Sequence, residues 1–91
     1  MKIEMIKFGN LLISRPSGKD AWLGIQSTLK NTKPNDQIIL DFKDVSVLTP
    51  SWMDEFLTPL KVKFKKVKIA NVESQVIKET IDFLENLPKQ S

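Results

Sequence analysis

The residues of this chain that could do chemistry are acids, serines and an arginine, because the sequence contains no cysteine and no histidine. Disulfide bonds, thiolate or imidazole metal sites and the usual general base near neutral pH are therefore excluded. Asp54 and Glu55 are adjacent in a predicted helix, so their side chains point about 100° apart, which disfavours a shared proton. We expect no catalytic residue, no cofactor and no metal ion, and hence a binding or switching module.

Three polar residues have more specific candidate roles. Ser51 begins a predicted helix and is a candidate phosphoacceptor, because a phosphate there would accept hydrogen bonds from helix-N-terminal amides; a plain N-cap is the simpler alternative. Arg15 could pair with Asp54 or Glu55, or could bind an anion or a partner's carboxylate. Asp41 ends a predicted buried strand, and we expect it to accept hydrogen bonds from loop amides.

Aromatic and basic residues add two further candidate surfaces. Trp22 and Trp52 could anchor an interface, although core packing is the commoner place for a helix tryptophan. Lysines are concentrated in one part of this chain of net charge +3 and could contact phosphates. Phe64 is the one aromatic among them, and its interleaving with Val62 and Val67 favours inward apolar residues with solvated lysines outside. The clustered lysines are Lys61, Lys63, Lys65, Lys66 and Lys68.

The N-terminal third is predicted to contain a hairpin and a helix. Two short apolar runs, residues 3–8 and 11–13, flank Gly9-Asn10, a pattern typical of a β-hairpin. Ser17 to Asp20 has the form of a capping box, which predicts a helix that ends near Asn31.

The remainder alternates between strands and helices. Residues 37–42 form a nearly continuous apolar run, typical of a strand buried on both faces. A second helix is predicted to begin at Ser51 and to kink or end early at Pro59. A strand over residues 67–70 and a helix over residues 74–87, with Leu87 at the end of its apolar side, complete the chain.

This order predicts one α/β domain over residues 1–91. Its four-stranded mixed sheet would contain the hairpin and then parallel strands, with three helices mainly on one face. The carboxyl ends of the last three strands meet at one edge of such a sheet, where sites of open α/β sheets lie. That edge would bring Asn71 near the candidate partner-binding residues, which are Ser14, Arg15, Thr49, Ser51, Trp52, Asp54 and Glu55.

Three segments in this order resemble the STAS-like domain family of unknown function. They are a Gly9 segment followed by Ser14-Arg15, a strand ending in Asp41-Phe42, and the Ser-aromatic-x-Asp-Glu helix start at residues 51–55. More remotely, the chain is similar to the STAS domains of anti-sigma factor antagonists. The resemblance implies an α/β sandwich of STAS type, in a minimal version without the last strand and helix of longer members.

The resemblance also implies a function, with one departure. In the antagonists a regulatory phosphoserine lies where this chain has Thr49-Pro50-Ser51, and Pro50 falls at the phosphorylated position. Trp52 replaces a small glycine. Phosphorylation-controlled sigma-factor antagonism is therefore not carried over intact. The implied role is a non-catalytic regulatory module that docks a kinase, ATPase or other regulator through the start of the second helix, with Ser51 as a candidate switch.

Two further expectations concern partners and location. The alternative function is a small basic nucleic-acid-binding domain that uses the lysines between residues 61 and 68. The first residues lack the apolar segment of a signal peptide, and no apolar run approaches the ~20 residues that span a bilayer. We expect a cytoplasmic protein with no membrane contact.

Overall fold

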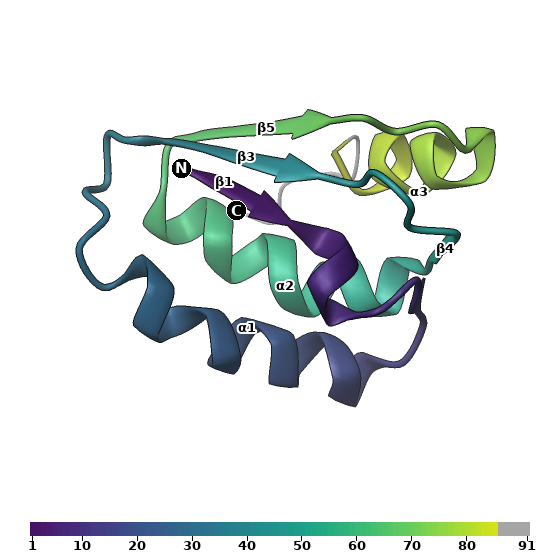
Figure 1. Cartoon of the computed structure of the whole chain (residues 1–91), viewed down its shortest axis with the longest axis horizontal. Helices are drawn as coiled ribbons and strands as arrows, with labels where there is room; N and C mark the ends of the chain where they lie inside the picture. The colour runs from purple at the N-terminus through teal and green to yellow at the C-terminus, as the bar shows by residue number, and fades with distance from the viewer. Residues whose placement is uncertain (86–91) are drawn as a thin grey trace, which may run out of the picture.

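Three parallel strands form the main sheet of the protein, whose computed structural model describes residues 1–85 (Figure 1). The strands β1 (Lys2–Glu4), β3 (Gln37–Asp41) and β5 (Lys66–Ala70) lie in the order β1-β3-β5. β3 is paired on both sides, and its residues Ile38, Leu40 and Asp41 are buried. The prediction of a central strand is confirmed, but burial on both faces is not: Ile39, on the face opposite Ile38 and Leu40, is only partly buried.

A second, two-stranded parallel sheet replaces the predicted hairpin. The strand β2 (Leu11–Leu12) pairs with β4 (Val47–Leu48), and β1 pairs with β3 instead of β2. Between β1 and β2 the chain forms a 3₁₀-helix, η1 (Met5–Phe8), which places Met5 in the core. Gly9 follows with φ of 118°, a backbone conformation that favours glycine. The prediction of one four-stranded mixed sheet is therefore wrong: the sheets have three and two strands, all parallel.

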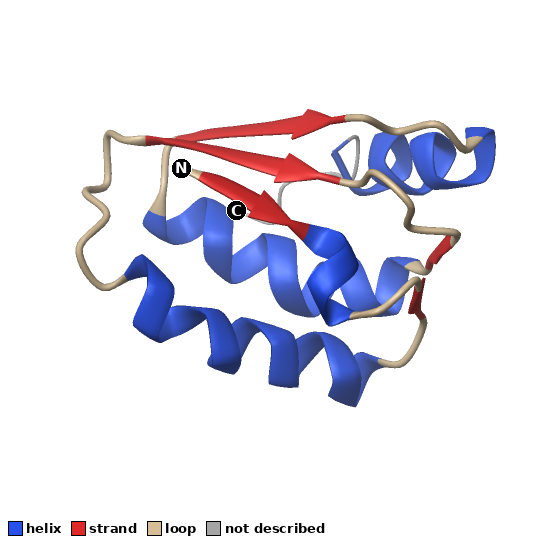
Figure 2. Cartoon of the chain, in the orientation of Figure 1, coloured by secondary structure: helices blue, strands red, loops and turns tan. Residues whose placement is uncertain are grey.

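The helices α1 (Arg15–Leu29), α2 (Pro50–Lys63) and α3 (Gln75–Glu85) lie on the same side of the main sheet (Figure 2). That side carries the buried residues Ile3 and Leu40, which are register neighbours across β1 and β3. Helices α1 and α2 pack against each other, and α3 contacts α2 and β4. Within residues 1–85, no helix lies over the other face of the sheet (Figure 1). The predicted position of Leu87 lies outside the described residues.

Both long helices begin earlier than the predicted capping boxes. Ser14 is the N-cap of α1, and its Oγ accepts a hydrogen bond from the Ser17 amide at 3.2 Å. Thr49 is the N-cap of α2, and its Oγ1 accepts from the Trp52 amide at 3.3 Å. The first turn of each helix contains a proline, whose missing N–H is not needed there. The predicted caps at Ser17 and Ser51 are therefore wrong.

Helix α2 runs through Pro59 to Lys63, so the predicted early ending is wrong. A proline inside a helix removes one backbone hydrogen bond. Here Phe56 and Leu60 on the apolar side of α2 are fully buried, and their packing keeps the helix in place. Within residues 1–85, no helix has both the length and the apolar composition needed to cross a membrane.

Candidate functional site

The first turns of α1 and α2 are joined by a cluster of three charged side chains. The Arg15 Nη1 atom donates to Glu55 Oε1 at 2.7 Å and to Asp54 Oδ2 at 3.0 Å. We call Arg15, Asp54 and Glu55 the Arg15 cluster. The sequence indicated an ion pair of Arg15 with either Asp54 or Glu55, and in the structure Arg15 pairs with both. With two carboxylates and one guanidinium, the cluster carries a net negative charge.

The Arg15 cluster is partly open to solvent. The exposed fractions of the Arg15, Asp54 and Glu55 side chains are 52%, 44% and 29%. Hydrogen bonds to Glu55 and Asp54 raise the pKa of Arg15. The bond from Arg15, together with one from Thr58 Oγ1, lowers the pKa of Asp54. Because exposed ion pairs contribute little to stability, these groups can exchange partners at small cost.

Hydrogen bonds between the segments that lead into α1 and α2 keep the residues of the Arg15 cluster close together. The Thr49 amide donates to the Leu12 carbonyl at 2.9 Å, and Thr49 Oγ1 donates to the Ile13 carbonyl. Thr49 therefore caps α2 and also ties it to the segment that leads into α1. Ser14 caps α1 and is exposed beside Arg15 in the sequence. The structure thus brings Ser14, Arg15 and Thr49 together where β2 and β4 end.

Trp52 fills the space between α1 and α2 and has no exposed surface. Its indole N–H donates to Ser17 Oγ at 3.2 Å, and its ring stacks on Phe56 with centroids 5.3 Å apart. A Cβ atom at Gly18 would lie 2.4 Å from the Trp52 carbonyl oxygen, so only glycine permits this close approach. Trp52 is consequently a core residue, and the interpretation of Trp52 as a surface anchor is corrected.

Ser51 is the second residue of α2 and is partly buried. Asp54 and Glu55 lie three and four positions further along, and such residues are neighbours on a helix surface. A phosphate on Ser51 would thus meet the positive end of the helix and, next to it, the two acids that bind Arg15.

A groove of about 470 Å³ runs beside the Arg15 cluster between α1 and α2. Leu23, at its edge, is 58% exposed, and Trp22 is half-buried. Sequence reasoning missed Leu23 and Pro59 as surface residues, because Leu23 falls outside the apolar spacing of its helix and Pro59 was read only as a helix breaker. The groove is lined by Lys19, Trp22, Leu23, Asp54, Glu55, Thr58 and Pro59.

A second charged centre lies where β3 ends. Asp41 is 4% exposed; its Oδ1 accepts from the Lys43 amide at 3.0 Å and from Asn71 Nδ2 at 2.9 Å. Its Oδ2 pairs with Lys2 Nζ at 3.1 Å. The bonds from Lys43, Asn71 and Lys2 lower the pKa of Asp41 to about 2. The predicted bonding of Asp41 to a loop amide is confirmed, and Asn71, with φ of 57°, joins Asp41 and not Arg15.

The lysines between residues 61 and 68 are all exposed. Phe64 is buried and therefore cannot stack on nucleic-acid bases. Val62 is 86% exposed, so its predicted inward packing is wrong; α2 continues through this position and turns Val62 to solvent. Lys61 pairs with Glu85 at 3.5 Å. This arrangement resembles a solvated lysine face more than a base-stacking platform.

Comparison with known protein families gives a match over the middle of the chain. The model of the family described as STAS-like domain of unknown function (DUF4325) matches residues 25–77, which is more than half of the chain. The matched part contains Asp41, Thr49, Asp54, Glu55 and Asn71, and it begins after Arg15. No curated protein and no solved structure matches the chain. Within residues 1–85, no group of three acidic side chains is arranged to hold a metal ion.

Proposed function

The chain belongs to the family of STAS-like domains of unknown function, and on that premise we propose that it is a non-catalytic regulatory module that docks a partner protein. The docking face consists of the α1–α2 groove and the Arg15 cluster. The observation that carries the proposal is the position of this half-exposed charged cluster directly beside an apolar groove. Protein interfaces typically combine an apolar centre with a polar rim of this kind.

The docking face also defines the chemistry of its partner. Leu23 and Trp22 offer apolar surface, which suits an apolar side chain of the partner inserted between the helices. Asp54 and Glu55 share a single guanidinium, so a lysine or arginine of the partner would complete the charge balance. We therefore propose a partner segment that places a basic residue next to an apolar one.

Phosphorylation of Ser51 is the proposed switch. A phosphate would add a charge of about −1.5 to −2 next to Asp54 and Glu55. It would compete with both acids for Arg15 while the start of α2 stabilises the phosphate. The cluster would rearrange without unfolding of the helix. A basic segment of the partner would then meet a different charge pattern on the same face.

The test is a quantitative pull-down from source-cell extract with matched variants. Leu23→Ser removes apolar surface from the docking face, and Val62→Ser removes it from an exposed position elsewhere on the helices. We expect Leu23→Ser, and Asp54→Asn combined with Glu55→Gln, to lower the captured partner at least tenfold, while Val62→Ser stays within twofold of wild type. Ser51→Glu should change capture more than tenfold with unaltered circular dichroism.

Two outcomes contradict the proposal. Equal capture by all variants would show that the docking face is not used. Capture that depends on Lys63, Lys65 and Lys66, falls steeply with salt and is abolished by nuclease would instead favour the nucleic-acid function.

A further inference from the structure

β5 is an edge strand of the main sheet in the part of the chain that the structure describes. Its one strand neighbour within residues 1–85 is β3. The Ala70 carbonyl accepts from the Phe42 amide at 3.0 Å, and in a parallel ladder alternate residues face the same neighbour. The N–H and C=O groups of Val67 and Ile69 therefore point away from β3. They are placed to pair with one more strand.

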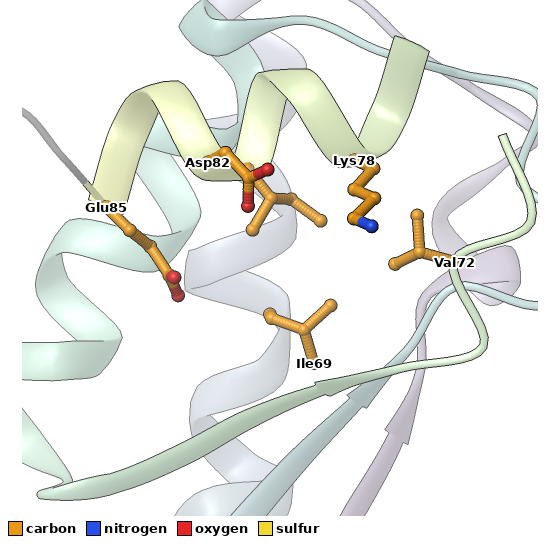
Figure 3. A pocket seen from close by; sticks show the side chains of 6 residues that line it. Ile69, Val72, Lys78, Asp82 and Glu85 are labelled. Atoms are coloured by element: carbon orange, nitrogen blue, oxygen red, sulfur yellow. The ribbon is translucent and has the colours of Figure 1, made fainter. Parts of the chain in front are cut away.

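A groove of about 360 Å³ lies along this edge, between β5 and α3 (Figure 3). Its apolar floor is formed by Ile69, Val72 and Ile81, and Figure 3 shows Ile69 and Val72 reaching toward α3 across the open space. Glu85, on the rim, already pairs with Lys61. The groove can therefore receive apolar side chains that a strand beside β5 would direct toward the helices.

The opposite face of the same strand is cationic. Lys66 and Lys68 alternate with Val67 and Ile69 along β5 and are exposed on the face that no helix covers within residues 1–85. Strand residues alternate between the two faces. An added strand would consequently meet an apolar groove with one set of side chains and two lysines with the other. In an antiparallel pair of two copies, these lysines would lie on one face and repel each other.

We propose that β5 binds an extended acidic segment of a partner protein as a fourth strand of the main sheet. Alternate apolar side chains of that segment enter the groove between β5 and α3, and the intervening aspartates or glutamates pair with Lys66 and Lys68. Backbone hydrogen bonds to Val67 and Ile69 give affinity, and the alternation of side chains gives specificity. This surface is separate from the docking face between α1 and α2, so either proposal can fail alone.

The probe is the acetylated and amidated peptide Glu-Val-Glu-Ile-Glu-Val-Glu. We expect it to slow hydrogen exchange of the Val67 and Ile69 amides at least tenfold, measured by NMR, and to shift the methyl signals of Ile81. Binding through a backbone ladder requires free peptide amides, so N-methylation of alternate peptide residues should weaken binding at least tenfold. A peptide with lysine in place of every glutamate should bind at least tenfold more weakly.

Charge-matched protein variants complete the test. Lys66→Glu with Lys68→Glu should weaken peptide binding at least tenfold. Lys30→Glu with Lys33→Glu alters two exposed lysines near the end of α1 by the same charge and should stay within twofold. Equal binding of the N-methylated or lysine peptide would overturn the proposal. So would a dimer that protects Val67 and Ile69 without peptide, because a second copy would then occupy the edge.

Discussion

The two charged centres of this protein contain similar residues in opposite environments. Asp41 is 4% exposed, and each of its oxygens has a partner from another segment: Lys2 from β1, and Lys43 and Asn71 from loops. The Arg15 cluster also joins distant segments, but it is half-exposed and has two acids for one base. The first centre is saturated and shielded. The second is partly exposed and carries one more negative than positive charge.

The difference shows that environment assigns the role of a carboxylate more than residue type does. Asp41 and Asp54 both have a lowered pKa, and for Asp41 the value falls to about 2. A buried carboxylate that loses its partners leaves an uncompensated charge, so its contacts are retained for structure. An exposed carboxylate can instead be solvated when its partner leaves. The comparison therefore separates a structural centre from the proposed binding centre.

The largest expected effect concerns the packing that positions the Arg15 cluster. In Gly18→Ala the new Cβ would lie 2.4 Å from the Trp52 carbonyl, which forces α1 and α2 apart. We expect a loss of about 2–3 kcal/mol in the free energy of unfolding, the upper part of the range for overpacking. Gly24→Ala is the control, because no atom lies within 4 Å of its added Cβ. That variant should gain about 0.5–1 kcal/mol. Equal urea midpoints of Gly18→Ala and Gly24→Ala would contradict the close approach of α1 and α2 at Gly18.

The second prediction tests the shielded centre. Asp41→Asn removes the charge that binds Lys2 and places donors or acceptors in a site built for a carboxylate. We expect Tm at neutral pH to fall by about 5–10 °C. Asp44→Asn is the matched control, because Asp44 is exposed and its left-handed φ of 68° suits asparagine. Its Tm should stay within about 2 °C of wild type.

The stability of the Asp41→Asn variant should also depend on pH differently from that of the wild type. Because the pKa of Asp41 is about 2 in the folded protein and about 3.9 in an unfolded chain, the unfolded state binds more protons in acid. The contribution of Asp41 to stability is present above about pH 4 and is lost as the pH falls toward 2. Asp41→Asn should therefore lose stability less steeply between these values in urea titrations. Parallel acid profiles of wild type and variant would refute the role of Asp41.

The smallest expected effect on stability concerns the Arg15 cluster itself. Arg15→Gln removes both ion pairs, yet the groups remain accessible to water. We expect Tm to change by at most about 3 °C. A drop as large as that of Asp41→Asn would remove the distinction between the two centres.

The positions of helices and strands could be predicted from the sequence where an element buries one side or all of its side chains. The apolar run at residues 37–42 predicted β3, and helical spacing predicted α1 and α2, because tertiary packing uses those same faces. The prediction of a hairpin was wrong. Residues 3–8 and 11–13 have the local features of paired strands, but they do not pair with each other. Which strand each one joins depends on contacts with β3 and β4, far away in the sequence.

The candidate site was predicted in part. Arg15 was matched with the acids of α2 because parallel strands bring their following loops together. The caps were placed two or three residues late, although proline in a first helical turn is a signal for Ser14 and Thr49. The bond from Lys2 to Asp41 was missed, since it requires the parallel register of β1 with β3. The burial of Trp52 depends on the close approach of Gly18 to its backbone. This contact joins residues that are far apart in the sequence, so the sequence alone did not predict it.

The parallel pairing of the strands also has a consequence for the speed of folding. Within residues 1–85, each pair of strands joins segments separated by at least one helix. No strand pair can form by closing a short turn, so the entropy of closing a long loop must be overcome before the first ladder is complete. The helices can form early because their contacts are local. We expect folding to be limited by the docking of β1 onto β3, and a chain truncated before β3 to leave β1 without a partner.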